Sequence, residues 1–458
     1  MYKIVLHGIK NKYGFDELVK IFLHPDNFTI FYDEMEKRPE ELPDSEYEHI
    51  IELTGKEKND LKIMLYNSLS EITGIKHEWG ILTGVRPVKL AGELIRKLGS
   101  NEAAKEKLTG YYLLSEEKAD LIIDIYNYQQ EILSKPPKDG IGMYIGIPFC
   151  PTRCLYCAFA SNKAVPAEIE RYLVALHKEI DAVSAMMNEK GIYPESIYIG
   201  GGTPTTLNAE QLDGLMKHVN EAFDVSKIRE FTVEAGRPDT IDKDKLEVIR
   251  NNGGDRISIN PQTMKNETLE IIGRSHKSED IIKSFEEAHE VGIPCINADL
   301  IAGLQGEDEN DFAASLLKMI ELGANNITVH TLSVKKASRL IEEDKYFHFK
   351  QAEVVRKQLA VGRKILKEHG YRPYYLYRQK NMAGGLENTG YCKDDLLSPY
   401  NIRIMEEEQT IVALGAGGIS KRYYPEENRL ERVPNVTNYQ IYIERLDEMI
   451  QRKEDNLF

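Results

Sequence analysis

The chain has 458 residues, of which 41% are hydrophobic and 29% are charged, as is usual for a globular protein of two or three domains. Its formal net charge of −15 argues against nucleic acid or an anionic membrane surface as the main partner. No apolar run approaches the ~20 residues that span a bilayer, and five cysteines make no disulfide framework. We therefore expect a cytoplasmic protein without a signal peptide.

Residues 1–135 predict a small α/β module followed by helices. Their apolar patterns favour strands at 2–7 and 28–32 and helices at 15–22, 57–72, 87–98 and 115–133. The only tryptophan, Trp79, lies in a run whose composition suits a packed turn, so a core role is favoured over a substrate role. The prolines and glycine of 134–140 predict a linker.

After this linker, short β-rich runs alternate with helical patterns. Strands are predicted at 141–147, 196–199, 230–234, 256–259, 294–300 and 326–331, and helices at 166–188, 208–223, 243–251, 278–291, 310–322 and 351–368. About six β/α units in a row predict an α/β fold, a parallel sheet curled into a partial (β/α)6 TIM-like barrel over 136–375. A doubly wound sheet is the alternative. Residues 376–458 are expected to form a short, helical extension that covers the barrel mouth.

Three clustered cysteines follow the first strand of the predicted barrel: Cys150, Cys154 and Cys157. Structural zinc sites and common iron–sulfur clusters take four protein ligands, so three thiols leave one position open for a substrate. A zinc site completed by a histidine, Cys295 or Cys392 is the alternative, although tetrahedral zinc favours paired Cys-x-x-Cys motifs.

The second predicted strand ends in the turn Gly200-Gly201-Gly202-Thr203-Pro204. The turn lacks the Gly-Lys-Ser/Thr ending of a phosphate-binding loop. A plain turn would need one glycine, whereas three adjacent glycines let a ligand lie against the backbone. Both the cysteine loop and this turn follow strands, so both are expected on the carboxyl-terminal face, where such barrels carry their chemistry.

The cysteine spacing, the aromatic residue before the last cysteine and the glycine turn together resemble the radical S-adenosylmethionine (SAM) superfamily. This resemblance implies a [4Fe–4S] cluster on the three cysteines, with SAM chelated by the fourth iron and cleaved to a 5′-deoxyadenosyl radical. Over residues 141 to about 446 it sharpens to the oxygen-independent coproporphyrinogen III oxidase group, especially its HemZ-type branch. It implies no catalytic residue beyond cluster and SAM, and it implies SAM-binding roles, the last two by looser alignment, for Tyr144, Tyr156, Gly201, Gly202, Thr203, Glu234, Gln262, Arg274, Asp299, Ser333 and Ile419.

The substrate of the resembled group carries four carboxylates, so basic residues late in the chain are candidates for binding it. These are Lys335, Lys336, Arg339, Arg372, Arg378, Lys380, Lys421 and Arg422. The segment 374–385 mixes tyrosines, bases and glycines, which predicts that it lines the substrate cavity with Arg378 as a substrate contact. A solvated loop fits the same composition.

The resemblance implies an oxidoreductase of porphyrin and heme biosynthesis, which decarboxylates two propionates of coproporphyrinogen III to give protoporphyrinogen IX. An electron donor such as flavodoxin or ferredoxin is implied, and a second SAM could lie beside the first through Gln262, Arg274 and Asp299.

Two other functions stay open at this point: a heme-binding chaperone and a radical enzyme that opens a heme ring. The resembled oxidases carry a further cysteine where this chain has the run 158–160, which brings it closer to the heme chaperones and the HemZ-type branch. His330 and Cys392 are candidate ligands for a heme iron, although no motif surrounds either of them.

Overall fold

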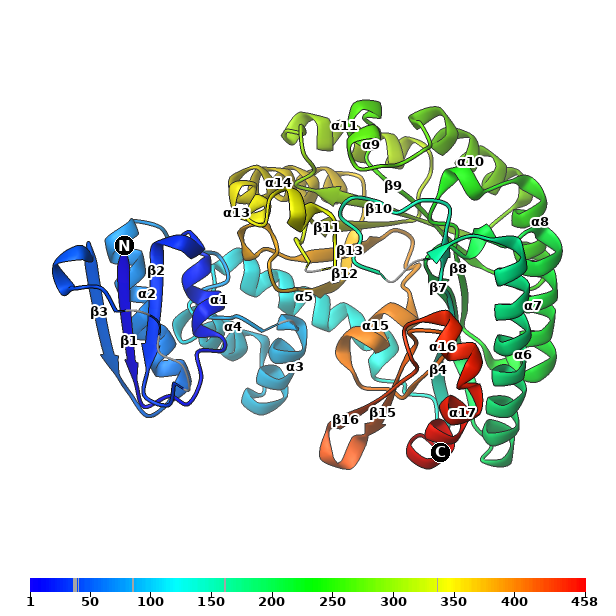
Figure 1. Ribbon diagram of the computed structural model, residues 1–458, viewed down its shortest axis with the longest axis horizontal. Coiled ribbons are helices and arrows are strands. Elements are labelled where there is room, and N and C mark those ends of the chain that lie inside the picture. The colour runs from blue at the N-terminus through cyan, green and yellow to red at the C-terminus, as the bar shows by residue number, and fades with distance from the viewer. Residues whose placement is uncertain (36–38, 40, 85, 160–161, 336) are drawn as a thin grey trace. The chain divides into compact units, whose positions relative to one another are not determined.

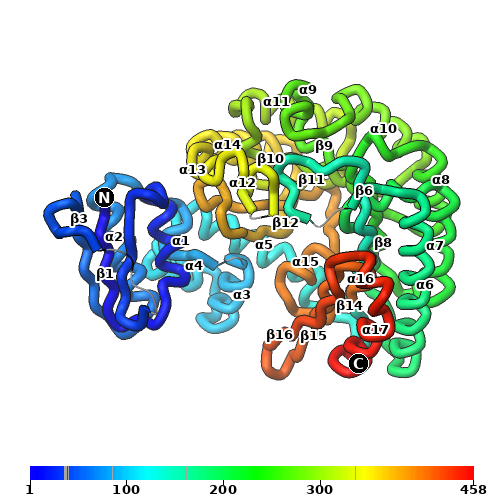
Figure 2. Tube along the Cα trace, in the orientation of Figure 1, coloured from blue at the N-terminus to red at the C-terminus, as the bar shows by residue number. Residues whose placement is uncertain are grey.

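Residues 376–387 leave the C-terminal half of the chain and pack with the N-terminal region. The computed structural model describes residues 1–35, 39, 41–84, 86–159, 162–335 and 337–458, so Lys336 lies outside the described residues. Within it the chain forms unit 1, residues 1–128 with 376–387, and unit 2, residues 129–375 with 388–458 (Figure 1, Figure 2). The sequence-based division at 135 and 375 assigned 376–387 to the extension instead.

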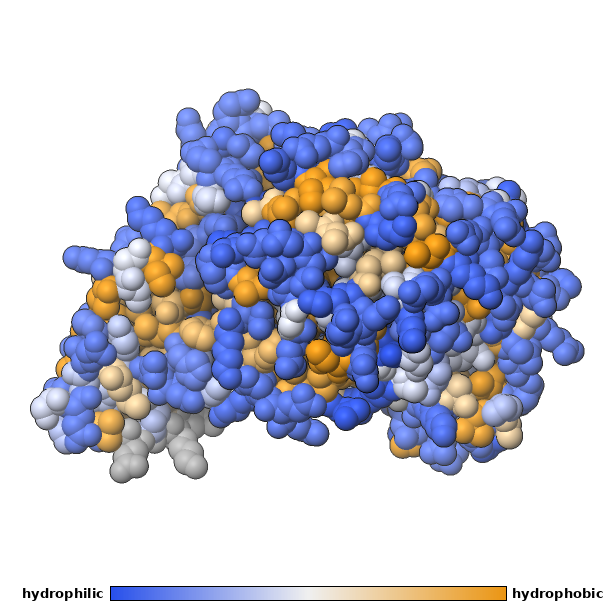
Figure 3. All heavy atoms as spheres, turned by 90° about the horizontal axis from the view of Figure 1, so that it is seen from above, coloured by the Kyte–Doolittle hydropathy of each residue, from blue (hydrophilic) through white to orange (hydrophobic). Residues whose placement is uncertain are grey.

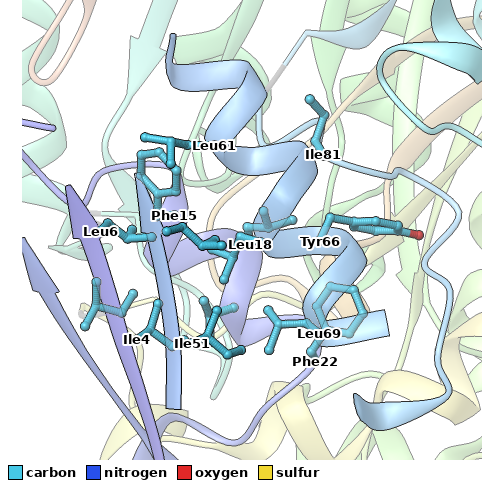
Figure 4. Packing of buried hydrophobic residues seen from close by; sticks show 14 of the residues in the cluster. Ile4, Leu6, Phe15, Leu18, Phe22, Ile51, Leu61, Tyr66, Leu69 and Ile81 are labelled. Atoms are coloured by element: carbon cyan, nitrogen blue, oxygen red, sulfur yellow. The ribbon is translucent and has the colours of Figure 1, made fainter. Parts of the chain in front are cut away.

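Unit 1 contains a three-stranded parallel sheet in the order β2-β1-β3. The hydrophobic faces of the strands and of two helices meet in one core, to which Ile4, Leu18, Ile51 and Leu69 contribute (Figure 4). The elements are β1 (Tyr2–His7), α1 (Phe15–Lys20), β2 (Phe28–Tyr32), β3 (His49–Thr54), α2 (Lys58–Thr73), α3 (Pro87–Leu98), α4 (Asn101–Gly110) and most of α5 (Glu116–Leu133), whose last residues belong to unit 2. Strand β3 and helix α4 were not expected from the sequence.

Unit 2 is built on six parallel strands that lie side by side in chain order, which confirms the partial barrel and excludes a doubly wound sheet. The strands are β4 (Gly140–Ile147), β7 (Tyr193–Gly201), β8 (Glu230–Glu234), β9 (Arg256–Gln262), β10 (Cys295–Ala302) and β11 (Asn326–Thr331). Between and after them come α6 (Pro166–Glu189), α7 (Ala209–Ala222), α8 (Lys243–Asn251), α9 (Asn266–Ile271), α10 (Ser278–Val291), α11 (Glu309–Glu321) and α14 (Ala352–Glu368). Figure 1 shows several of these helices along the outside of the sheet.

Further strands extend this sheet at both ends. Beyond β4 lie β14 (Ile411–Leu414), parallel to β4, and the antiparallel strands β15 (Ile419–Tyr424) and β16 (Arg429–Pro434). Beyond β11 lie β13 (Asn388–Cys392), antiparallel to β11, and β12 (Arg372–Tyr377). The remaining strands and α-helices are β5 (Phe149–Cys150), β6 (Asn162–Lys163), α12 (Leu340–Glu343), α13 (Phe347–Lys350), α15 (Pro399–Glu406), α16 (Tyr439–Glu444) and α17 (Leu446–Asn456). The extension therefore contains strands as well as the expected helices.

Helix α15 lies at the amino-terminal end of the barrel strands. The Ser398 hydroxyl and the Tyr400 amide both donate to the carboxylate of Glu230, the first residue of β8. Arg403 pairs with Glu195, and each of these side chains is 1% exposed. This helix of the extension thus lies at the end of the barrel opposite the cysteine loop, where it supplies the partners of the buried Glu230 and Glu195 carboxylates. That the extension covers the barrel mouth stays a prediction.

The surface is mainly hydrophilic in the space-filling view, with scattered apolar side chains (Figure 3). None of the helices in the described part of the chain is both long and apolar enough to cross a membrane.

Candidate metal centre

The cysteine loop leaves β4 and is held by several parts of unit 2. The Leu155 amide donates to the Ile272 carbonyl at 3.0 Å, and the Leu340 amide donates to the Leu155 carbonyl at 3.1 Å. Among the described residues, no three Cys, His, Asp or Glu side chains gather tightly enough for a single metal ion. An iron–sulfur cluster does not require its thiolates to converge on one ion, because each thiolate would bind a different iron.

Arg237 anchors the same loop and was missed by the sequence analysis. Its guanidinium donates to the Thr152 hydroxyl at 2.7 Å and makes a two-point ion pair with Asp239 at 2.9 and 2.7 Å. A further bond of 3.3 Å reaches the Ser275 hydroxyl. Since Arg237 is only 3% exposed, these bonds fix the backbone between Cys150 and Cys154. The sequence does offer a signal for Arg237, because this residue follows closely after Glu234 at the end of a predicted strand.

The glycine turn lies directly against the cysteine loop. The Gly202 amide donates to the Ile147 carbonyl and the Thr203 amide to the Phe149 carbonyl, both at 2.8 Å. A Cβ on Gly202 would lie 2.5 Å from the Phe149 oxygen and 3.0 Å from the Cys150 sulfur. Gly201 has a φ of 117° and equally lacks space for a Cβ. The turn therefore needs glycine because the backbone passes so close to the first thiol.

Glu234 ends β8 beside this turn, as predicted. Its carboxylate accepts a hydrogen bond of 2.6 Å from the Tyr198 hydroxyl and one of 3.3 Å from the Gly201 amide. Burial raises the pKa of Glu234 to about 7, and the charge of Asp299 adds to this rise, while the two hydrogen bonds oppose it. The carboxylate thus changes protonation near neutral pH.

Three tyrosine rings follow one another inside the barrel. Tyr144, a predicted site residue, is stacked with Tyr198 at a centroid distance of 6.2 Å, and Tyr198 is stacked with Tyr400 at 4.7 Å. Tyr198 and Tyr400 were not predicted. Tyr198 occupies the same register on β7 as Tyr144 does on β4, which was a usable signal once the two strands were paired.

Tyr156 and Arg274, both predicted site residues, contact each other. One terminal nitrogen of Arg274 donates to the Tyr156 hydroxyl at 2.9 Å and the other to the Gly236 carbonyl at 3.0 Å. The Arg274 Nε atom is buried and has no hydrogen-bond partner among the described residues. Arg274 thus ties the cysteine loop to the end of β8.

Gln262 and Asp299 lie towards the carboxyl-terminal ends of β9 and β10. Gln262 is buried with a φ of 70°, and its Oε1 atom has no hydrogen-bond partner in the part of the chain that the structure describes. Asp299 accepts from Asn297 at 2.7 Å and lies 3.4 Å from the His330 imidazole. The buried Gln262 Oε1 atom, which lacks a described partner, and the glycine turn, which carries no Cβ atoms, fit a small polar ligand such as SAM.

The other predicted residues lie in other parts of the chain. Ser333 is half-buried after β11, and Ile419 is 48% exposed at the start of β15. Arg378 lies in unit 1, where its guanidinium donates to the carbonyls of Leu82 and Gly385. Its substrate role stays a prediction.

The candidate heme ligands differ in their surroundings. His330 lies beside Asp299 near the carboxyl-terminal end of β11, whereas Cys392 is 1% exposed in β13.

Comparison with known proteins gives three findings. The family model of the radical SAM superfamily matches residues 144–319. The oxygen-independent coproporphyrinogen-III oxidase-like protein HemZ of Bacillus subtilis is 41% identical over 404 residues, which cover 86% of this chain and 80% of the relative. Heme chaperone HemW of the same organism is 31% identical over 60% of this chain and 69% of its own length.

A solved structure supports the fold independently. Coproporphyrinogen III oxidase (HemN) from Escherichia coli matches with a TM-score of 0.55 at 22% identity, over 71% of this chain and 73% of that one. At this identity the match shows a shared fold.

Proposed function

Because this chain belongs to the radical SAM superfamily and, within it, to the family of HemZ, we propose that it decarboxylates propionate side chains of coproporphyrinogen III. The observation that carries the proposal is the contact between the cysteine loop and the glycine turn, with Glu234 and the Tyr156–Arg274 pair around it. The 41% identity to a coproporphyrinogen-III oxidase-like protein supports the choice of substrate.

The proposed reaction balances for each propionate. One C–H bond and the C–C bond to the carboxylate break, giving a vinyl group and carbon dioxide. The abstracted hydrogen leaves on 5′-deoxyadenosine and methionine is released. One electron enters from a reductant, for which flavodoxin or ferredoxin is proposed, and one leaves to an acceptor.

The residues present fit the cofactors that the superfamily implies. Cys150, Cys154 and Cys157 would hold a [4Fe–4S] cluster, which together with SAM supplies the hydrogen-abstracting radical chemistry. The glycine turn exposes backbone without side chains to a ligand beside Cys150. The Glu234 carboxylate can accept hydrogen bonds from ammonium or hydroxyl donors there, and charge-assisted bonds of this kind are strong.

Residues of this chain also prepare the site before any ligand binds. Tyr198 and the Gly201 amide orient the Glu234 carboxylate. Arg274 holds the Tyr156 hydroxyl, so that the ring next to Cys157 is fixed. Arg237 and Asp239 hold the loop backbone, and such preorganisation lowers the cost of ordering on binding.

A heme chaperone is the second candidate function, favoured by the 31% identity to HemW. It predicts tight heme binding by protein that carries the cluster and no loss of carbon dioxide from the porphyrinogen.

The test is an anaerobic assay of reconstituted protein with dithionite, SAM and coproporphyrinogen III, followed by mass spectrometry. Protoporphyrinogen IX together with 5′-deoxyadenosine supports the decarboxylase. 5′-Deoxyadenosine without porphyrin turnover means a radical enzyme with another substrate. If a [4Fe–4S] spectrum is present, heme binds tightly and neither product forms, the chaperone is favoured. The Cys150→Ala protein is the inactive control and Cys392→Ala the matched active control.

A further inference from the structure

Lys62 is a buried cation in unit 1, and none of the carboxylates that the structure describes forms an ion pair with it. The residue lies on α2 and is 7% exposed. Its ammonium donates to the Thr83 hydroxyl at 2.7 Å, and no ion pair with it is found among the described residues. An ammonium group has three donors, so the hydroxyl leaves it incompletely satisfied. Burial, together with the charges of Lys58 and Arg378, lowers the pKa of Lys62 to about 8.

Arg378 is a second buried cation beside the same stretch of backbone. It is 9% exposed, and its guanidinium donates to the Leu82 carbonyl and the Gly385 carbonyl. The Arg378 guanidinium also lies 4.9 Å from the centre of the Trp79 ring, but this side chain is neutral and does not balance the positive charge. Lys62 and Arg378 thus bind adjacent residues, Thr83 and Leu82, from the same unit of the protein.

The carboxylates whose negative charges raise the pKa of Arg378 already have other cationic partners. Glu387 bonds to Lys118 and to the Trp79 indole, and Glu17 lies 3.4 Å from Lys20. Burying uncompensated charge is unfavourable, and two neighbouring like charges increase the cost. The local positive charge of Lys62 and Arg378 is thus opposite in sign to the net charge of the whole chain, which is −15.

The backbone of Gly14 passes close to Lys62 and Thr83. Gly14 has a φ of 85°, and an added Cβ would lie 3.2 Å from the Lys62 ammonium and 3.3 Å from the Thr83 hydroxyl, closer than an ordinary van der Waals contact. Tyr13 is 59% exposed, and its ring carries the ammonium groups of Lys58 and Lys380 at 5.6 and 4.2 Å. Positive charge therefore continues from the buried pair to the surface.

We propose that Lys62, Thr83 and Arg378 form a binding site for a phosphate dianion, either free phosphate or the terminal group of a phosphate ester. Lys62 and Arg378 have no ion-pair partner among the described residues, and their two positive charges match a dianion better than a single carboxylate. The Lys62 ammonium and the Thr83 hydroxyl supply donors, and the buried setting strengthens charge-assisted bonds. The site lies within unit 1 and does not depend on the proposed radical chemistry.

The test is calorimetric titration of the full-length, anaerobically purified protein with inorganic phosphate, at constant ionic strength set by chloride. Wild-type protein is expected to bind one phosphate per chain in unit 1. Lys62→Met should weaken the affinity by about tenfold or more, as the loss of a charge-assisted bond requires, and Thr83→Val should weaken it less. Lys105→Met, which alters a lysine paired with Glu116 and Asp120 in the same unit, should leave it unchanged.

Thermal unfolding separates this site from a merely structural lysine. Without phosphate, Lys62→Met should unfold at the same or a higher temperature than wild type, since the variant removes an uncompensated buried charge. Phosphate should raise the unfolding temperature of wild type and not that of the variant. Equal phosphate affinity in both proteins, or no binding by wild type above chloride, overturns the proposal. If Lys62→Met does not fold, unchanged affinity in Thr83→Val overturns it. Glucose 6-phosphate in place of inorganic phosphate tells an ester site from a free-phosphate site.

Discussion

The Tyr198 hydroxyl donates a 2.6 Å hydrogen bond to the Glu234 carboxylate, across the neighbouring strands β7 and β8. Glu234 also accepts from the Gly201 amide, so one half-buried carboxylate links the tyrosine stack to the glycine turn. Its protonation therefore affects both the stability of the barrel and the state of the candidate site.

Glu234→Gln should stabilise the protein at neutral and higher pH. The pKa of Glu234 is about 7 in the folded protein and about 4.5 when unfolded, so the folded state binds more protons between these values. Wild type should thus lose stability as the pH rises from 4.5 to 7, by up to about 3 kcal/mol, and the variant should not. Thermal unfolding from pH 5 to 8 without SAM measures this, with the exposed Glu210→Gln as control. A difference between variant and wild type that does not change with pH would contradict the prediction.

Replacing any one of Cys150, Cys154 and Cys157 by alanine should abolish the cluster, because three thiolates are already one fewer than common clusters take. Iron and sulfide analysis after anaerobic reconstitution measures the loss. Cys295→Ala and Cys392→Ala, at buried cysteines outside the loop, are matched controls that should keep the cluster. Retention of a full cluster by a loop variant would falsify the assignment of that ligand.

Arg274→Met should weaken SAM binding by about tenfold or more, since the variant loses hydrogen bonds to both Tyr156 and Gly236. Iron content should stay close to wild type, which separates this role from cluster binding. Tyr156→Phe keeps the ring and loses the hydroxyl, so a smaller effect is expected. Equilibrium dialysis with labelled SAM measures the affinity, and Arg171→Met, on the outer helix α6, is the control. Unchanged affinity in Arg274→Met would rule out the role.

Lys453→Met should destabilise unit 2 by about 3–5 kcal/mol, because it leaves the buried Glu179 charge without its cation. The two side chains are both 0% exposed and lie 2.7 Å apart. Glu179 also accepts from the Gly415 amide and the Tyr442 hydroxyl, so the C-terminal segment depends on it. Chemical denaturation measures the change, with the exposed Lys283→Met as control. A loss below about 1 kcal/mol would show that the pair contributes little.

Lys118→Met should loosen the segment 376–387 within unit 1. Lys118 is 1% exposed and pairs with Glu387, the last residue of that segment, and with Glu78. The variant removes the ammonium that pairs with Glu387, whereas the Trp79 indole still donates to this carboxylate. Limited proteolysis should cut the segment faster than in wild type, whereas Lys105→Met should behave as wild type. Equal cleavage rates in all three proteins would contradict the prediction.

Several features of the barrel could be read from local sequence. The periodic apolar residues of α8 and α10 and the compact runs of β8 and β11 gave element bounds that the structure reproduces. Strand β3 (His49–Thr54) was not predicted although its residues alternate between buried and exposed, because the apolar Ile50 lies on the exposed face and breaks the alternation in the sequence. The cysteine loop and the glycine turn were found because their residues are close together in the chain.

Only the tertiary structure decided which distant residues meet. The return of 376–387 to unit 1, the position of α15 and the roles of Tyr198 and Arg237 all depend on contacts between residues far apart in the chain. The burial of Lys62 beside Thr83 is likewise decided by tertiary contacts, since a lysine on a helix normally lies in solvent. Local periodicity reports which face of an element is buried, whereas the partner of a buried charge is set by long-range packing. For this reason the sequence by itself determined the fold class and the motifs of the candidate centre, and the tertiary structure decided the side chains that support them.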